Sequence, residues 1–242
     1  MLPEFPRFQE LLEKSEVLMK DRHGLKVVGA RDGRIVKFFR RKRLLSSALW
    51  DPYVKRFARN AGNLKKAGIP TVEVTGIFRV SSLQRDAVVY NRMEGESLRD
   101  LPMTEPRMAS FAAFFAELHR KGVFFRSVHF GNILELPDGR LGLIDIADMV
   151  VKGRSLGVKE RLRNFAHMVK YPEDRQMLRD FGMERFIRVY EKSADLDGWR
   201  AKAFGQAVRT QTGVAIGWQR ALERVCSRGW HPMTRQISRS RF

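Results

Sequence analysis

LHRKGVFFRSVHFGNIL at residues 118–134 and LIDIAD at residues 143–148 are the most informative stretches of this 242-residue chain. The segment that leads into the first of them, residues 104–121, is rich in Phe and Ala and is amphipathic at helical spacing. Pro106 stands in its first turn, where proline is well tolerated. The pattern predicts a deeply buried helix that anchors the second half of the molecule.

Two short β-like runs follow this helix. Residues 132–136 and 141–144 are predicted to be strands, and the turn sequence PDG between them predicts a hairpin. Such a hairpin folds back the 13 residues that separate Asn132 from Asp145, so both side chains are expected at one site. From about residue 156 the chain is predicted to be helical.

The first part of the chain predicts a β-meander with one helix. Strands are expected at residues 17–20, 25–28, 34–39, 71–78 and 87–90. The Asp32-Gly33 pair before the third strand is a strong hairpin signal, and apolar residues at three- and four-residue spacing predict a helix over residues 52–66. The expected unit is therefore five antiparallel strands with a helix inserted after the third, ending at the GESL break of residues 95–98.

Composition indicates a folded protein. A hydrophobic fraction of 43% with 17 Phe is enough for a core, and no apolar run approaches the roughly 20 residues that span a bilayer. Acidic residues near the N-terminus, such as Glu4 and Glu10, are not typical of a signal peptide. The single Cys226 cannot form an intramolecular disulfide, which fits a reducing compartment. We therefore expect a cytoplasmic protein.

The formal net charge of +19 is concentrated in two segments. Residues 37–66 hold ten Lys or Arg and one acid, and residues 199–242 hold nine Lys or Arg and one acid. This distribution favours an anionic partner, although a plain solvated basic face is the alternative. Specific nucleic-acid binding is not expected, because aromatic residues do not interleave with the basic ones and no helix-turn-helix or zinc-finger spacing is present.

The two central stretches resemble the catalytic loop and the metal-binding segment of the kinase superfamily, in the branch that contains aminoglycoside and choline phosphotransferases. In that branch a buried helix ends in Leu-His, the loop ends in Gly-Asn-Ile-Leu, and an Ile-Asp follows on the next hairpin. The resemblance implies an α+β, protein-kinase-like two-lobed fold. Residues 1–95 would form a small antiparallel N-lobe with one inserted helix, and residues 96–242 a mainly helical C-lobe.

The same resemblance implies ATP and Mg²⁺ as cofactors and assigns roles to individual residues. Asn132 and Asp145 would be the magnesium ligands, since their oxygens suit a hard cation that bridges nucleotide phosphates. Lys37, on the third predicted strand, would hold the phosphates as a point charge. The main chain near Asn91 and Met93 would hydrogen-bond adenine.

Two departures from the family pattern bear on catalysis. Ser127 stands five residues before Asn132, where the family has its catalytic Asp, and a Ser hydroxyl cannot accept a proton near neutral pH as a carboxylate can. Asn60 stands where the family has a Glu that pairs with the lysine and so belongs to the expected cofactor site. His129, two residues after Ser127, is the candidate replacement base, with a structural histidine as the alternative.

Over nearly its whole length the chain also resembles the lipopolysaccharide core heptose kinases and the related toluene tolerance proteins. This resemblance is carried by GRIVKFFRRK at residues 33–42, GIPT at 68–71, GESL at 95–98 and FRSVH at 125–129. It implies that the partner is a sugar of the lipid-linked core oligosaccharide, or another anionic glycolipid, at the cytoplasmic face of the inner membrane. Basic segments would favour peripheral contact with that anionic surface.

Two functions are left open at this point. The first is an ATP-dependent sugar kinase of the lipopolysaccharide core, in which catalysis comes mainly from positioning and charge neutralisation. The second is a catalytically degenerate pseudokinase that serves as a binding or regulatory module in envelope biogenesis. Ser127 and the absent Glu favour the second.

Overall fold

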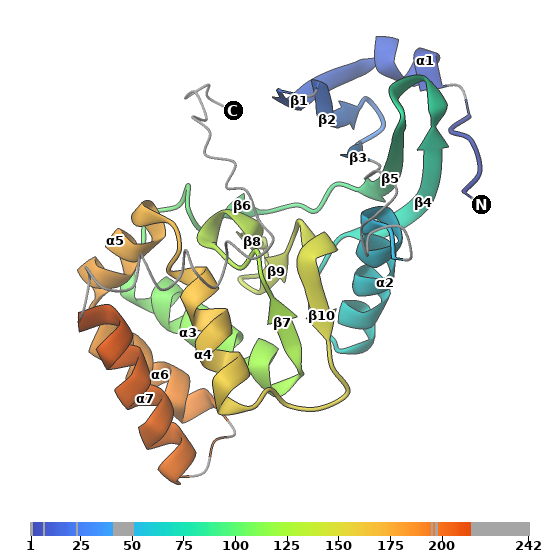
Figure 1. Cartoon of the computed structure of the whole chain (residues 1–242). Helices are drawn as coiled ribbons and strands as arrows, with labels where there is room; N and C mark the ends of the chain where they lie inside the picture. Colours follow the sequence, from blue (N-terminus) through green and yellow to red (C-terminus); the bar gives the residue numbers. More distant parts are fainter. Residues whose placement is uncertain are drawn as a thin grey trace.

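The structure is a computed structural model that describes residues 2–6, 8–22, 24–40, 51–194, 196 and 198–213. The cluster of basic residues at 41–43, Cys226 and most of the basic C-terminal segment lie outside the described residues. Figure 1 shows two lobes, with the sheet of the N-terminal part at the upper right and the helices of the C-terminal part at the lower left.

The N-terminal lobe is a five-stranded antiparallel sheet. The strands follow the spatial order β1-β2-β3-β5-β4. They are β1 (Ser15–Asp21), β2 (Gly24–Ala30), β3 (Arg34–Arg40), β4 (Glu73–Val80) and β5 (Arg85–Asn91), and the short helix α1 (Phe8–Glu13) precedes them. Gly33 has φ +80°, a left-handed conformation that closes the turn between β2 and β3 as the Asp-Gly signal predicted.

The predicted inserted helix is α2 (Tyr53–Lys66). Its apolar positions lie at helical spacing, and Val54, Phe57 and Leu64 are fully buried. The helix ends at Ala67, and Gly68 follows with φ +66°. Because α2 contacts both β4 and β5 of the sheet and the segment after Asp145, it touches both lobes.

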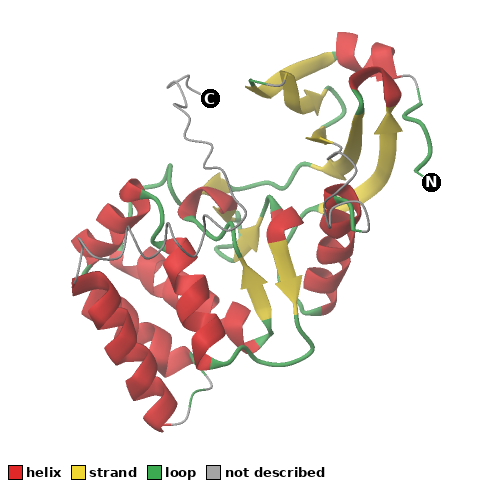
Figure 2. Cartoon of the chain, viewed as in Figure 1, coloured by secondary structure: helices red, strands yellow, loops and turns green. Residues whose placement is uncertain are grey.

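The C-terminal lobe is built on α3 (Glu105–Arg120). The Thr104 hydroxyl accepts a hydrogen bond from the Arg107 amide at the N-cap, and Pro106 occupies the first turn. Phe111 and Phe115 have no exposed surface, so the predicted burial is confirmed. The other helices are α4 (Val158–Met168), α5 (Pro172–Phe181), α6 (Met183–Ser193) and α7 (Gly198–Gly213). Figure 2 shows how helices predominate in this lobe.

Five short strands lie beside these helices. The predicted hairpin is β8 (Ile133–Glu135) with β9 (Leu141–Leu143), and β6 (Glu96–Ser97) adds to it. The remaining two, β7 (Val123–Phe125) and β10 (Met149–Val151), pair with each other. The short 3₁₀ turn η4 (Ile146–Asp148) connects Asp145 to β10. The β6 and β7–β10 pairings were not expected from the sequence.

The two lobes share one hydrophobic core. Residues of α2, of β5 and of α3 belong to the same buried cluster, which continues into α6 and α7. Hydrogen bonds also join the lobes, because the Thr71 hydroxyl donates to the Leu143 carbonyl over 2.8 Å and the Leu143 amide donates to the Pro70 carbonyl over 2.9 Å. The expected α+β class, with an antiparallel sheet lobe and a mainly helical lobe, is confirmed. The predicted division of the chain at residue 95 falls in the connection between β5 and β6.

None of the helices in the described ranges is long and apolar enough to cross a membrane.

Candidate active site

Lys37 and Asp145 meet across the two lobes. Lys37 lies at the centre of β3, where Val27 and Val88 flank it on the neighbouring strands, and its side chain is only 8% exposed. Its Nζ is 2.6 Å from Oδ1 of Asp145, which follows β9 in the other lobe. The contact joins the two charged residues that the sequence placed at the site, from positions 108 residues apart.

The backbone of Asp145 is left-handed, with φ 54° and ψ 44°. This conformation is uncommon for a residue with a side chain and is most easily adopted by Asn and Asp. Burial acts to raise the pKa of the Asp145 carboxyl, but the charge and hydrogen bond of Lys37 hold that pKa below its usual value. The carboxylate is therefore ionised near neutral pH, and its side chain is partly buried, with 41% of its surface exposed.

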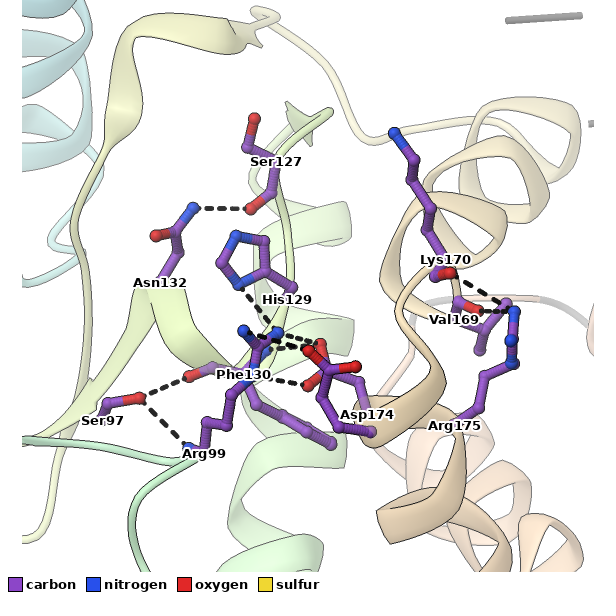
Figure 3. Close-up of polar contacts among 11 residues, drawn as sticks. Ser97, Arg99, Ser127, His129, Phe130, Asn132, Val169, Lys170, Asp174 and Arg175 are labelled. Atoms are coloured by element: carbon purple, nitrogen blue, oxygen red, sulfur yellow. Dashed lines mark hydrogen bonds and ion pairs between the residues drawn. The ribbon is translucent and has the colours of Figure 1, made fainter. Parts of the chain in front are cut away.

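Asn132 has its amide group held in one orientation. Its Nδ2 donates to the main-chain carbonyl of Ser127 over 2.9 Å, as Figure 3 shows, so Oδ1 is the atom left to bind a ligand. The Ile144 amide donates to the Asn132 carbonyl over 3.0 Å, which fixes Asn132 beside the residue that precedes Asp145. The hairpin thus brings together the two residues expected to hold metal.

The donor set of Asn132 and Asp145 fits magnesium. One amide oxygen and one carboxylate are hard oxygen ligands, and Mg²⁺ is usually bound by one or two carboxylates with the remaining positions filled by phosphates and water. No group of three or more His, Cys, Asp or Glu suited to a metal occurs within the described part of the chain. Nucleotide phosphates and water would supply the remaining ligands of a magnesium ion bound here.

Ser127 lies on the loop that leaves β7. The loop is fixed to the segment after Asp145, because the Arg126 amide donates to the Asp148 carbonyl over 3.0 Å and β7 pairs with β10. The Ser127 main chain supports Asn132, while its side chain offers only a hydroxyl at the expected position of the catalytic carboxylate. As the sequence indicated, Ser127 provides no carboxylate that could act as a base.

His129 is clamped in a neutral state. Its Nδ1 lies 3.4 Å from Nη2 of Arg99, and its ring packs edge-on against Tyr171 with centroids 4.8 Å apart. Since a guanidinium can only donate, Nδ1 must accept, which leaves the proton on Nε2. Burial and then the charge of Arg99 lower the pKa of His129 to about 4. Nε2 lies on the side of the ring that faces Ser127 and Asn132 (Figure 3), so this geometry favours a hydrogen-bond donor over the base expected from the sequence.

Arg99 is itself held by a buried carboxylate. Asp174, in the first turn of α5, has no exposed side-chain surface and accepts from Nε and Nη2 of Arg99 over 3.0 and 2.9 Å. It also accepts from the Phe130 amide over 3.2 Å, which ties α5 to the loop (Figure 3). Gly131 allows this packing, because a Cβ there would approach the His129 ring to 3.1 Å and Arg99 to 3.3 Å.

The start of the loop is fixed by a second buried network. The Asn164 side chain donates to the Phe125 carbonyl over 2.6 Å and accepts from the Phe125 amide over 3.3 Å. His119 bridges Asn164 and the Tyr190 hydroxyl, to which Arg161 donates. Because Oδ1 of Asn164 can only accept, Nε2–H of His119 donates to it, and Nδ1 of the neutral ring accepts from the Tyr190 hydroxyl. The loop is thus anchored at both ends by side chains from four helices, α3 to α6.

Comparison with solved structures identifies this architecture. An aminoglycoside-3'-phosphotransferase of type VIII superposes with a TM-score of 0.56 at 15% sequence identity, covering 84% of this chain and 98% of that one. The chain has the protein-kinase-like fold. Two structures of WbdD, one with a kinase inhibitor, are similar at TM-scores of 0.47 and 0.44 and at 16% and 15% identity; they cover 81% and 78% of this chain. The chain spans about half of WbdD, 47% and 48% in the two comparisons.

No family model matches the sequence of this kinase-like chain, and no curated protein matches it. The structural likeness at 15% identity is a likeness of fold. The narrower resemblance to lipopolysaccharide core heptose kinases is therefore taken up below as a proposal.

Helix α2 is held to the C-lobe by Asn60, at the position where the family pattern has a Glu. The Asn60 side chain, 2% exposed, donates to the main-chain carbonyls of Ile146 and Met149 over 2.7 and 3.2 Å. One turn earlier, Arg56 pairs with Asp148 over 3.3 Å. These contacts make Asn60 a link between α2 and the segment after Asp145, and its expected cofactor role stays a prediction.

The segment that links the kinase-like lobes begins at the end of β5. Asn91 is exposed, and its side-chain amide donates to the Glu73 carboxylate over 3.2 Å. The main-chain amide of Arg92 donates to the Gly33 carbonyl. Met93 packs on β9, since a Cβ at Gly142 would collide with its side chain. Within the described residues the main-chain groups of Met93 have no hydrogen-bond partner, so they are free for the predicted contact with adenine.

Sequence reasoning missed the residues that support the site. Arg99 and Asp174 are 75 residues apart, and an Asp in the first turn of a helix is usually read as a partner of the helix dipole. Lys26 on β2 was also missed, although its charge helps to lower the pKa of Asp145. No local spacing could have indicated these contacts. The only available signal was that Arg99 directly follows the GESL break.

Proposed function

We propose that the chain is an ATP-dependent phosphotransferase that phosphorylates a sugar hydroxyl of the lipopolysaccharide core. The observation that supports the nucleotide site is the ion pair of Lys37 with Asp145 between the lobes, with Asn132 held by the main chain beside the residue that precedes Asp145. The fold supports phosphotransfer as the class of reaction. The choice of acceptor rests on the resemblance of four ordered segments to the heptose kinases and on the positive charge of the chain.

Each of the three residues has a role in this proposal. The Lys37 ammonium contacts the nucleotide phosphates, and in their absence Asp145 satisfies its charge. Asn132 and Asp145 hold magnesium, which when bound neutralises the charge that develops on the phosphates. The main chain of Met93 receives the adenine ring.

The reaction breaks the bond between the terminal phosphorus of ATP and the bridging oxygen and forms a bond between that phosphorus and the acceptor oxygen. ADP leaves with the bridging oxygen, and the acceptor proton passes to a phosphoryl oxygen or to water, because Ser127 is too weak a base to take it. Little covalent work falls to the protein in such a loose transition state. The Nε2–H of His129 donates a hydrogen bond to the transferred group on the side of Ser127.

The proposed acceptor places the protein at an anionic surface. Each basic side chain near an anionic leaflet contributes about 1 kcal/mol to binding. The two basic segments of the sequence together hold nineteen Lys and Arg, enough for peripheral contact with phosphorylated glycolipid. The protein then acts at the cytoplasmic face of the inner membrane.

The test is phosphate transfer from Mg-ATP to deacylated core oligosaccharide by the purified protein. We expect phosphorylated oligosaccharide and ADP in equal amounts, and loss of both with Asp145→Ala. Asp100→Ala, which removes an exposed carboxylate from the same lobe, is the matched control and should retain activity. Absence of transfer by the unaltered protein would refute the proposal.

A pseudokinase is the second candidate, and specific residues favour it. Ser127 replaces the carboxylate base, and Asn60 replaces the acid that would pair with Lys37. In this case Mg-ATP would raise the melting temperature, because a ligand that prefers the native state stabilises it, but no phosphate would be transferred. The protein would then serve as a binding or regulatory module in envelope biogenesis.

A further inference from the structure

A strongly basic pocket lies away from the candidate active site. It has a volume of about 590 Å³ and is formed where the C-terminal ends of α2 and α3 meet the loop after β10. In Figure 1 this loop follows the lower end of β10, near the lower end of α2. We call it the basic pocket; its cationic lining residues are Lys66, Arg120, Lys121, Lys152 and Arg154.

The positive charge of the basic pocket is only partly balanced. Lys121 pairs with Glu117 over 2.5 Å, and a single carboxylate, Glu160, is shared by Lys152 and Arg154. Lys66 and Arg120 are exposed and have no acidic partner among the described residues. Five cations thus face two carboxylates, so the pocket keeps an excess of three positive charges.

Helix ends explain only part of this arrangement. Lys66 and Arg120 stand in the last turns of α2 and α3, where the helix dipole favours a cation. Lys152 and Arg154 belong to a loop and gain nothing from a helix end. If these cations served only to keep the surface solvated, the end of α2, the end of α3 and the loop after β10 would not need to come together.

The convergence is fixed by the backbone. The Lys152 amide donates to the Gly122 carbonyl over 2.9 Å, which binds the loop to the end of α3. Gly122 has φ +76°, and a Cβ at this position would collide with the main-chain carbonyls of Lys152 and Arg154. The close approach of the loop therefore requires glycine, and the cations are brought together by the fold and not by flexible side chains alone.

We propose that the basic pocket binds a phosphate group, either of a free phosphorylated ligand or of a lipid headgroup. Like charges held together raise the free energy of the folded state, and a bound anion removes that cost. Lys and Arg together suit phosphate, as point charges and as a planar donor pair. No aromatic side chain lines the pocket, so the stacking platform of a single-stranded nucleic acid is missing. The proposal does not depend on the active-site chemistry.

The experiment compares two double variants that carry the same net charge. Lys66→Glu with Arg120→Glu reverses the two unpaired cations of the pocket. Arg188→Glu with Lys192→Glu reverses two exposed cations on α6, of which Lys192 also stands in a last helical turn. Both variants keep the Lys37 site, so any anion bound there contributes equally to both. The difference in affinity between the two variants therefore measures binding at the basic pocket.

Two probes separate the possible sources of phosphate. Inorganic pyrophosphate is titrated by calorimetry, and sedimentation is measured with phosphatidylcholine vesicles with and without phosphatidylglycerol. We expect the pocket variant to bind at least one probe about tenfold more weakly than the α6 variant. A loss for pyrophosphate assigns a free phosphorylated ligand, and a loss confined to the anionic vesicles assigns a lipid headgroup.

Equal binding of both probes by the two variants would overturn the proposal. A difference seen only with duplex DNA would also overturn it, since the surface would then serve nucleic acid. If the Glu variant does not fold, as judged by its circular dichroism and melting temperature, Lys66→Gln with Arg120→Gln replaces it and Arg188→Gln with Lys192→Gln becomes the control.

Discussion

Ser127 and His129 lie on the loop after β7, and neither is suited to remove a proton from an acceptor hydroxyl. Ser127 lacks a carboxylate, and the accepting nitrogen of His129 already faces Arg99 at 3.4 Å. The charges that would act on phosphate remain in place, because Lys37 and Asp145 are 2.6 Å apart and Asn132 is oriented by the loop. At this scale the site is better equipped to bind and position a nucleotide than to activate a nucleophile.

Ser127→Asp restores a carboxylate five residues before Asn132. If the reaction lacks only a base, we expect kcat to rise about 100-fold, the range typical of a positioned general base. The measurement is ADP release with Mg-ATP and deacylated core oligosaccharide. Ser127→Asn, of similar size but unable to accept the proton, is the control, and equal rates for the two variants would show that proton removal does not limit turnover.

Helices α4 and α5 determine the shape of the loop that carries these residues. Asn164 from α4 holds the main chain of Phe125, and Asp174 from α5 holds Phe130 and Arg99. Both side chains are almost completely buried. Two helices therefore control the positions of residues in the candidate site.

Asp174→Asn should destabilise the fold and loosen the loop. It leaves the partly buried Arg99 without its buried counter-charge, and we expect a loss of about 2 kcal/mol or more in the free energy of unfolding. Urea unfolding measures this value. Glu173→Gln is the control, because Glu173 is 51% exposed and lies 3.6 Å from the same Arg99, where an ion pair contributes about 0–1 kcal/mol. Similar losses for both variants would contradict a special role of Asp174.

Elements with sustained periodicity or a clear turn signal could be predicted from the sequence, and short strands without either signal could not. The helix over residues 104–121 and the helix over residues 52–66 agree with α3 and α2 to within a residue or two, because their apolar periodicity is sustained over several turns. By contrast β7 and β10 have three residues each and pair without a connecting turn. A strand of three residues is too short to show a periodic pattern, and the strand with which it pairs is determined by the tertiary structure.

The same contrast between local sequence signals and tertiary packing applies to the residues of the candidate site. Lys37, Asn132 and Asp145 were predicted together because a family motif fixes their order. In the structure Lys37 contacts Asp145, and Asn132 lies at the start of the adjoining hairpin, while their roles stay predictions. Arg99 and Asp174 were missed because the contact between them depends on how α5 packs against the loop. Local sequence signals do not report such packing.

At the scale of the whole molecule, three histidines are held neutral by burial. Burial and nearby positive charges lower the pKa of His119 to about 3 and that of His129 and His167 to about 4. The unfolded chain, with a His pKa near 6.5, binds more protons than the native state between about pH 4 and 6.5. Stability should therefore be fully present above pH 6.5 and decrease as the pH falls through this window.

For the fully buried His119 alone the expected loss is about 2 kcal/mol at about pH 5 relative to neutral pH. Urea unfolding at the two pH values measures the total for the unaltered protein. In His119→Gln, which is less stable at both pH values because the network is broken, the difference between them should be smaller by about the same 2 kcal/mol. An unchanged difference would show that His119 does not set the pH response.

The buried cluster that runs from α2 and β5 into α3 and α6 has a practical meaning for handling this protein. Expressed alone, the β-rich lobe would expose Phe57 and Leu64, and the helical lobe would expose Phe111. Large exposed apolar surfaces of this kind promote aggregation. We therefore predict that cutting the chain at the proposed boundary, residue 95, would destabilise both parts. Fragments would be poor reagents, and replacing one lobe with that of another protein of this fold would have to preserve the whole shared core.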